Sequence, residues 1–153
     1  MIKEGDKAGD FNLTDDKGQS IKLSSFRGKK IVLYFYPKDD TPGCTKEACS
    51  FRDIYDDILK AGAVVIGVSP DNGASHVKFR EKFNLPFYLL SDPEHKAAES
   101  YGAWGEKKMY GKSYMGIIRS TFIIDENFKI LKAFPKVTPE GHGEEVLAAL
   151  KNA

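Results

Sequence analysis

The sequence predicts an α/β protein in which helices flank a mixed central β-sheet, and three observations lead to this fold class. Residues 31–36 and 63–68 are continuously apolar, as strands covered on both faces are. A helical pattern separates these two runs, and strand and helix patterns continue to alternate after them. Two strands joined by a short turn and a final helix then complete the chain. Alternating units place parallel strands side by side, whereas the late hairpin adds antiparallel ones.

The elements of the first part follow from turn residues and periodicity. Residues 11–13 and 21–23 alternate in polarity across an Asp/Gly-rich turn, so we expect an N-terminal β-hairpin. Residues 31–36 should form the central strand, which Pro37 ends. From about residue 42 to residue 60, apolar side chains recur at helical spacing, which predicts one helix.

The second part is predicted in the same way. Residues 103–118 are rich in Gly, Lys and aromatic residues and have no clear period, so we expect a long functional loop there. The other expected elements are strands at 63–68 and 87–90, helices at 75–83 and 93–101, a hairpin of 121–124 with 129–134, and a helix at 143–151.

Composition limits the class of protein and its partners. With 153 residues, 41% of them hydrophobic and 29% charged, the chain is expected to form a single globular domain, residues 1–153. Its formal charge is +1 and it carries no basic stripe, so we expect no nucleic-acid partner. The charged start and the absence of an apolar run of about 18 residues predict no membrane segment and a cytoplasmic location.

The two cysteines, Cys44 and Cys49, lie where a helix should begin. If Thr41 is the N-cap, Pro42 is the first helical residue and Cys44 lies in the first turn. Free amides and the helix dipole favour an anion there, so Cys44 should be a nucleophilic thiolate, and the Thr41 hydroxyl could position a substrate. The simpler alternative is a capped helix with a buried structural cysteine.

The spacing of the cysteines restricts how they can pair. Five residues along a helix separate the two Cα atoms by roughly 8.6 Å. A disulfide requires less than about 7 Å. The two residues can therefore bond only if the first turns of the helix unwind, which fits transient pairing during redox turnover.

A cysteine pair can also act as a thioredoxin-type dithiol or bind a metal ion. A thioredoxin-type dithiol needs Cys-x-x-Cys, which this chain lacks, and His76, His95 and His142 are too scattered for a typical zinc site. We therefore expect no metal site. A protein dithiol/disulfide oxidoreductase and a redox-sensing or chaperone-like binding domain remain as alternatives.

The pattern Pro37-x-x-x-Thr41-x-x-Cys44, directly after an apolar strand, resembles the active-site motif of peroxiredoxins. The longer stretch 36–53 is similar to the peroxiredoxin Q group, also called bacterioferritin comigratory protein, as are residues 101–111 and 119–125. The resemblance runs from about Gly5 to the final helix. One departure is Ala8-Gly9, where the family usually has Ala-Pro, and it affects only an entry turn.

The resemblance implies a thioredoxin-like fold and an antioxidant thiol peroxidase that reduces hydrogen peroxide and alkyl hydroperoxides without metal, haem or flavin. Cys44 would be the peroxidatic residue, oxidised to a sulfenic acid. Cys49 would be the resolving residue, forming an intramolecular disulfide with Cys44. Thioredoxin or a similar dithiol would then restore the thiols. The relatives are often monomers, and we expect the same here.

The resemblance also assigns roles to other residues. Arg119 would stabilise the thiolate and the charge on the departing oxygen, although a solvated surface arginine is the ordinary alternative. Glu47 would orient Arg119, or would be an exposed acid in the first helical turn. Pro37 would shape the turn that presents Thr41.

Three aromatic residues, Phe35, Tyr36 and Trp104, could form an apolar collar around the thiolate or could belong to the core. Lys107 and Lys108 form a short basic patch that we expect to be solvated surface.

Overall fold

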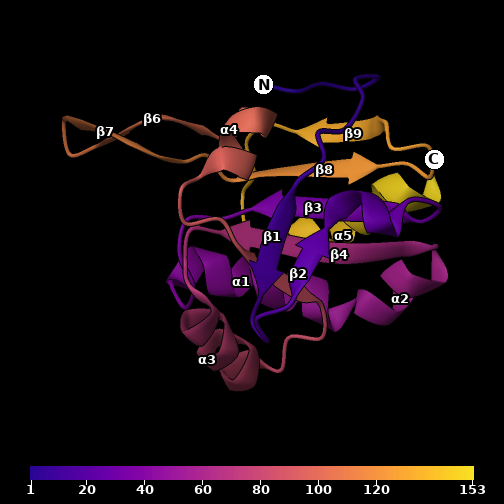
Figure 1. Cartoon of the computed structure of the whole chain (residues 1–153), viewed down its shortest axis with the longest axis horizontal. Coiled ribbons are helices and arrows are strands. Elements are labelled where there is room, and N and C mark those ends of the chain that lie inside the picture. The colour runs from indigo at the N-terminus through magenta and orange to yellow at the C-terminus, as the bar shows by residue number, and fades with distance from the viewer.

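A seven-stranded mixed sheet forms the middle layer of the molecule in the computed structural model, which describes residues 1–153 (Figure 1). Its strands are β1 (Asn12–Asp15), β2 (Ser20–Lys22), β3 (Lys30–Phe35), β4 (Ala63–Ser69), β5 (Tyr88–Ser91), β8 (Ser120–Ile124) and β9 (Ile130–Phe134). They lie side by side in the order β2-β1-β5-β4-β3-β8-β9. Strand β3 is parallel to β4 and antiparallel to β8, so the sheet is mixed as predicted.

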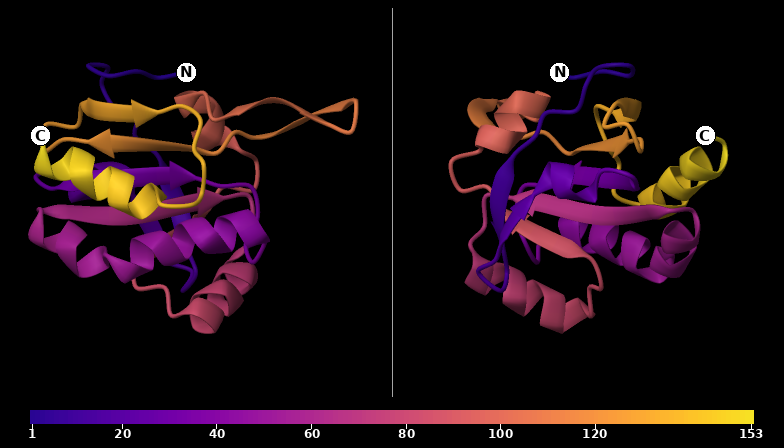
Figure 2. Two further views of the ribbon diagram at one scale, coloured as in Figure 1. Left: turned by 180° about the vertical axis from the view of Figure 1, so that it is seen from behind. Right: turned by 45° about the vertical axis from the view of Figure 1, so that its right-hand side comes forward.

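Helices cover both faces of this sheet (Figure 2). They are α1 (Pro42–Asp53), α2 (Tyr55–Lys60), α3 (Gly73–Phe83), α4 (Lys96–Tyr101) and α5 (His142–Lys151), with a 3-10 turn, η1, at Leu23–Phe26. None of the helices combines the length and the apolar character that a membrane crossing requires.

The continuous apolar run of β3 is explained by two separate hydrophobic clusters. Ile31, Leu33 and Phe35 pack into the cluster on the face that carries α4. The alternate residues, such as Val32 and Tyr34, pack into the cluster formed with α1, α2, α3 and α5. Because side chains alternate along a strand, both faces of β3 must be apolar.

The prediction of a long loop at residues 103–118 is wrong. The structure forms an antiparallel hairpin there, β6 (Trp104–Met109) with β7 (Lys112–Ile117), which projects from the body of the molecule (Figure 1). Its turn residues Tyr110 and Gly111 both have positive φ, the geometry that suits a two-residue hairpin turn. Most side chains of the hairpin are exposed on both faces, so no apolar alternation marks the strands.

The single helix expected from residue 42 to residue 60 is divided in two. Ile54 leaves helical geometry, with φ −120° and ψ 16°, and separates α1 from α2. Phe51 and Ile58 on either side are both fully buried in the same cluster. Because the apolar residues keep helical spacing across the break, the sequence pattern does not reveal it.

Helix α5 packs unusually closely on α1. The Gly143 N–H donates to Ser50 Oγ at 3.0 Å. A Cβ atom added at Gly143 would collide with the backbone carbonyl of Ser50. The absence of a side chain at this residue therefore allows the two helices to meet beside Cys49.

We expect Gly143→Ala to lower the free energy of unfolding by about 2 kcal/mol, because the backbone of α1 cannot rotate away from the new methyl group. Urea denaturation followed by circular dichroism measures this loss. Glu144→Ala, one residue along the same helix and exposed, is the control and should change stability little. Equal stability of the two variants would contradict the packing described here.

Candidate active site

Cys44 lies in the first turn of α1, as the sequence predicts. Thr41 has the extended backbone of an N-cap, Pro42 is the first helical residue, and the Thr45 N–H donates to the Thr41 carbonyl at 2.8 Å. The Cys44 residue is only 1% exposed and packs with the cluster beneath β3. The sulfur therefore lies between the helix start and the apolar core.

Arg119 reaches this sulfur from a distant part of the chain. Its Nη2 donates to Cys44 Sγ at 3.2 Å, and its Nη1 donates to Glu47 Oε1 at 2.7 Å. Ser120 of β8 pairs with Phe35 of β3, so the residue before β8 arrives level with the end of β3. Strand pairing thus delivers the guanidinium to the loop that precedes α1.

Glu47, one turn after Cys44, is fully buried and is not the exposed first-turn acid of the alternative interpretation. Its Oε2 atom has no hydrogen-bond partner. Burial raises the pKa of Glu47 to about 7, although Arg119 opposes this rise. At neutral pH the carboxylate therefore carries only part of a negative charge.

Arg119, unlike Glu47, keeps its full charge at neutral pH. Burial disfavours the guanidinium, but the neighbouring Glu47 and Cys44 outweigh burial, and the pKa of Arg119 is raised. Because Arg119 is fully charged and Glu47 is only partly ionised, the pair carries a net positive charge next to the Cys44 sulfur. A thiolate accepts the bond from Nη2 better than a thiol does.

The Thr41 hydroxyl makes no hydrogen bond to the sulfur. Its Oγ1 donates to the Lys38 carbonyl at 2.8 Å, and the side chain makes no capping bond to α1. Pro37 is half-buried just after β3, at the start of the same loop. The hydroxyl oxygen keeps its lone pairs, so it can still accept a hydrogen bond from a bound molecule.

Gly43 keeps the first turn open toward Arg119. A Cβ atom there would lie 3.2 Å from Arg119 Nη2, so any other residue would crowd the guanidinium. A cleft of about 220 Å³ adjoins this turn and is lined by Pro42, Gly43, Lys46, Thr138, Pro139 and Glu140.

Cys49 lies further along α1 and is partly exposed. Both cysteines are free thiols, and they lie in one unbroken helix. Partial burial raises the pKa of the Cys49 thiol, with Arg52 opposing the rise. The structure therefore describes the reduced protein, in which Cys49 is a thiol.

The structure contains no group of three His, Cys, Asp or Glu side chains that could hold a metal ion. His76 and His142 are buried, and each is hydrogen-bonded to other side chains of the protein. His95 stacks on Trp104 with ring centroids 3.6 Å apart.

Of the two alternatives for Phe35, Tyr36 and Trp104, the structure supports packing in or against the core rather than an apolar collar. Phe35 and Trp104 pack in or against the cluster on the face of the sheet opposite Cys44. Tyr36 is on the same face as Cys44 but is fully buried. Strand alternation separates Phe35 from its neighbour Tyr36, which adjacency in the sequence conceals.

Lys107 is a residue of this region that sequence reasoning misses. It is partly buried on β6, whereas Lys108 is exposed as predicted. Burial lowers the pKa of Lys107, and so does Arg119, while Cys44 opposes the change. This electrostatic coupling indicates that Lys107 lies near Cys44 and Arg119. The sequence gives no sign of this proximity, because Lys107 belongs to a hairpin that is mostly exposed.

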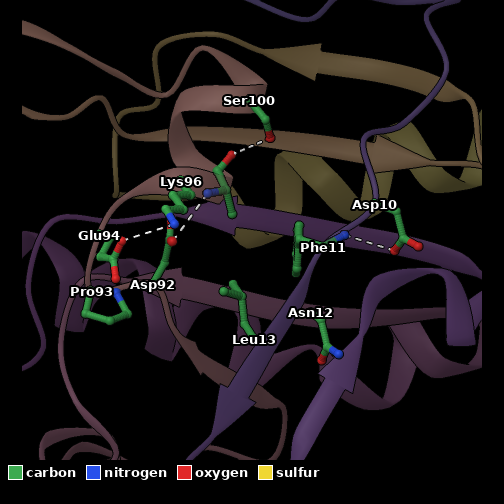
Figure 3. Close-up of a pocket in the computed structure, with 10 residues that line it drawn as sticks. Asp10, Phe11, Asn12, Leu13, Asp92, Pro93, Glu94, Lys96 and Ser100 are labelled. Carbon is green, nitrogen blue, oxygen red and sulfur yellow. Dashed lines mark hydrogen bonds and ion pairs between the residues drawn. The ribbon is translucent and has the colours of Figure 1, made fainter.

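A separate cleft of about 360 Å³ lies on the other side of the sheet (Figure 3). One wall is formed by β1 and the loop before it, and the other by the segment that leads into α4 and by α4 itself. Leu13 and Ala97 in these walls pack with the hydrophobic cluster on the face opposite Cys44. It contains none of the residues described above, so it is not part of the Cys44 site. Its lining residues are Asp10, Phe11, Asn12, Leu13, Asp92, Pro93, Glu94, Lys96, Ala97 and Ser100.

Comparisons with known proteins show the family to which the chain belongs. The AhpC/TSA family pattern matches residues 4–133. Peroxiredoxin Bcp of Bacillus subtilis (strain 168) is 54% identical over 151 residues, which are 99% of this chain and 96% of that protein. A structure of peroxiredoxin Q from Xanthomonas campestris has a TM-score of 0.88 at 40% identity and covers 93% of this chain and 90% of its own. A cysteine-to-serine mutant of PrxQ from Xylella fastidiosa has a TM-score of 0.94 at 35% identity, covering 99% and 97%.

The fold and the placement of a cysteine at a helix start define a thiol-dependent peroxidase on a thioredoxin-like fold. The chain belongs to the AhpC/TSA family, in its peroxiredoxin Q/Bcp group. This membership favours the peroxidase over the dithiol oxidoreductase and the redox-sensing binding domain.

We expect the buried Glu47 to make stability depend on pH. Its folded pKa of about 7 exceeds the ordinary value of 4.5, so the folded protein holds a proton that the unfolded chain releases. The stabilisation is complete below about pH 4.5 and is lost as the pH rises through about 7. The wild type should therefore lose roughly 3 kcal/mol relative to Glu47→Gln between these limits.

Urea denaturation of wild type and Glu47→Gln at several pH values checks this expectation. Taking the difference between the two proteins cancels groups they share, such as His142, whose pKa burial lowers. A difference that stays constant from pH 4.5 to about pH 8 would show that Glu47 titrates normally.

Proposed function

We propose that the chain reduces hydrogen peroxide and organic hydroperoxides at Cys44, that Cys49 resolves the oxidised residue by an intramolecular disulfide, and that thioredoxin or a similar dithiol recycles the enzyme. The single observation that carries this proposal is the Arg119 guanidinium, which donates to Cys44 Sγ while it is held by the buried Glu47. Peroxidatic and resolving roles for the cysteines, and supporting roles for Thr41 and Pro37, are part of the proposal.

In the first step the Cys44 thiolate attacks the terminal oxygen of the hydroperoxide. The S–O bond forms as the O–O bond breaks, and the departing oxygen takes a proton and leaves as water or alcohol. The sulfur is oxidised to a sulfenic acid and the peroxide is reduced. Arg119 lies where it can stabilise the negative charge that develops on the oxygens.

The peroxide must reach a sulfur that is nearly covered. The cleft beside Pro42 and Gly43 adjoins the first turn, and the absence of a side chain at Gly43 leaves that turn open. The Thr41 hydroxyl could turn from the Lys38 carbonyl to donate to a peroxide oxygen. Among the relatives, the Xanthomonas campestris bacterioferritin comigratory protein, 39% identical, has alkyl peroxide reduction activity.

In the second step the Cys49 sulfur attacks the Cys44 sulfenic acid. The S–S bond forms, the S–O bond breaks, and water leaves with the thiol proton. Because α1 is unbroken between the two residues, its first turns must unwind before the sulfurs can meet. An external dithiol then reduces the disulfide by exchange and is itself oxidised.

Cys44→Ser should abolish the consumption of hydrogen peroxide when thioredoxin, its reductase and NADPH are supplied. Serine has nearly the same size but is a far weaker nucleophile at neutral pH, so the fold should remain while the reaction stops. NADPH absorbance measures turnover, and circular dichroism verifies folding. Turnover at the wild-type rate would refute Cys44 as the site of oxidation.

Cys49→Ser should allow one oxidation of each chain but should slow thioredoxin-dependent recycling by more than about tenfold. The reason is that no second thiol remains in the chain to convert the sulfenic acid into a disulfide. Mass spectrometry after trapping with dimedone should find a labelled Cys44 in the variant and a disulfide in the wild type. Recycling at an unchanged rate would exclude Cys49 as the resolving residue.

A further inference from the structure

A buried polar cluster lies behind the loop that joins β3 to α1, apart from the Cys44, Glu47 and Arg119 set. At its centre, Asp39 Oδ2 is 2.7 Å from His76 Nδ1. Asp39 is 7% exposed and His76 is 0% exposed. Burial of an acid and a base together requires that each be well paired.

Both ring nitrogens of His76 have a partner. Nε2 is 3.0 Å from the Leu90 carbonyl, and Nδ1 is 2.7 Å from Asp39 Oδ2. Rotation of the imidazole would break both contacts in the interior, where unpaired polar groups are costly, so the ring and the Asp39 carboxyl group hold each other in place.

Asp39 also joins three other parts of the chain to the loop. Its Oδ1 accepts from the Tyr36 hydroxyl at 2.6 Å, and its Oδ2 accepts from Ser75 Oγ at 2.8 Å. Its own N–H donates to Asp71 Oδ2 at 2.7 Å. The end of β3, the start of α3 and the segment after β4 are thus tied to one residue of the loop.

The position of this cluster in the loop gives it a specific consequence. Asp39 precedes Thr41 by two residues and Cys44 by five, and the intervening Asp40 has a positive φ of 57°. A non-glycine residue in that region must be held by its surroundings. On the other side of the cysteines, α1 is held at Ser50 by Gly143 and at Arg52 by the Phe83 carbonyl, 2.8 Å away.

We propose that the Asp39/His76 pair is a positioning device for the peroxidatic loop. It holds residues 37–41, and with them the first turn of α1, in the geometry in which Arg119 reaches Cys44 Sγ. The inference rests on the proposed function and extends it, because the pair should favour the peroxide step and oppose the unwinding that lets Cys44 meet Cys49. Unwinding is then confined to the residues between this anchor and Ser50.

The experiment compares Asp39→Ala with Asp16→Ala. Asp16 is a matched control because it also pairs with a basic residue of α3, Arg80, at 2.6 Å, but it ties down the turn between β1 and β2. Asp39→Asn is the conservative variant, which keeps the size of the side chain and part of its hydrogen bonding.

We expect Asp39→Ala to slow oxidation of Cys44 by hydrogen peroxide about tenfold or more, as loss of alignment does, and to speed the later formation of the disulfide. Rapid quenching with a thiol-blocking reagent, followed by mass spectrometry of the oxidised and disulfide forms, can follow the two steps. Asp39→Asn should restore part of the first rate, and Asp16→Ala should leave both steps within about twofold of the wild type. Loss of both steps together, no change in either, or the same effect in Asp16→Ala would overturn the proposal.

Amide hydrogen exchange of the reduced protein gives a readout that needs no peroxide. The amides of residues 45–49 should exchange about tenfold faster in Asp39→Ala and at the wild-type rate in Asp16→Ala. If Asp39→Ala does not fold, Ser75→Ala removes one bond to Asp39 and should produce the same changes at smaller size; unchanged exchange there overturns the inference. An unreactive Cys44 in the wild type, with exchange responding as described, would instead contradict the proposed function.

Discussion

The arrangement around Cys44 depends on one buried cation, the guanidinium of Arg119, shared between a sulfur and a carboxylate. A cation in a largely buried position is stable only if its donors are used, and Cys44 and Glu47 accept two of them. Glu47 is completely buried, and Arg119 offsets only part of the cost of its charge, because the pKa of Glu47 is still raised to about 7. Removing any one of the three leaves an uncompensated group in the interior.

The fold supplies this cation through strand pairing and leaves the cysteines on a helix held at both ends. The pairing of β3 with β8 places Arg119 at the start of α1, although it is 75 residues from Cys44 in the sequence. The network centred on Asp39 holds the loop before α1, and the contact of Gly143 with Ser50 holds the helix beyond Cys49. In the proposed redox cycle, these two contacts would confine unwinding to the start of α1 and leave the sheet unchanged.

Strong patterns in the sequence predicted most elements, and weak patterns explain the failures. The run from Ile31 to Tyr36 is apolar at every position, which is typical of a strand covered on both faces, and most of it forms β3. The prediction that it is the central strand is wrong by one place, because β4 lies in the middle of the seven strands and β3 is its neighbour. The hairpin of β6 and β7 is exposed on both faces, so no alternation distinguishes it from a loop. The break at Ile54 was not visible either, because the apolar spacing continues through it.

The sequence by itself determined the chemistry at the start of α1: Thr41, Pro42, Gly43 and Cys44 form a helix N-terminus through local backbone preferences that need no distant contact. It also indicated a resemblance in which Arg119 and Glu47 act together. Only the tertiary structure decided that Glu47 is buried, that Arg119 touches both partners, and that Phe35 and Trp104 lie on the far side of the sheet. The physical reason is that burial and ion pairing depend on which strands become neighbours, and strand neighbours are chosen by the packing of the whole core.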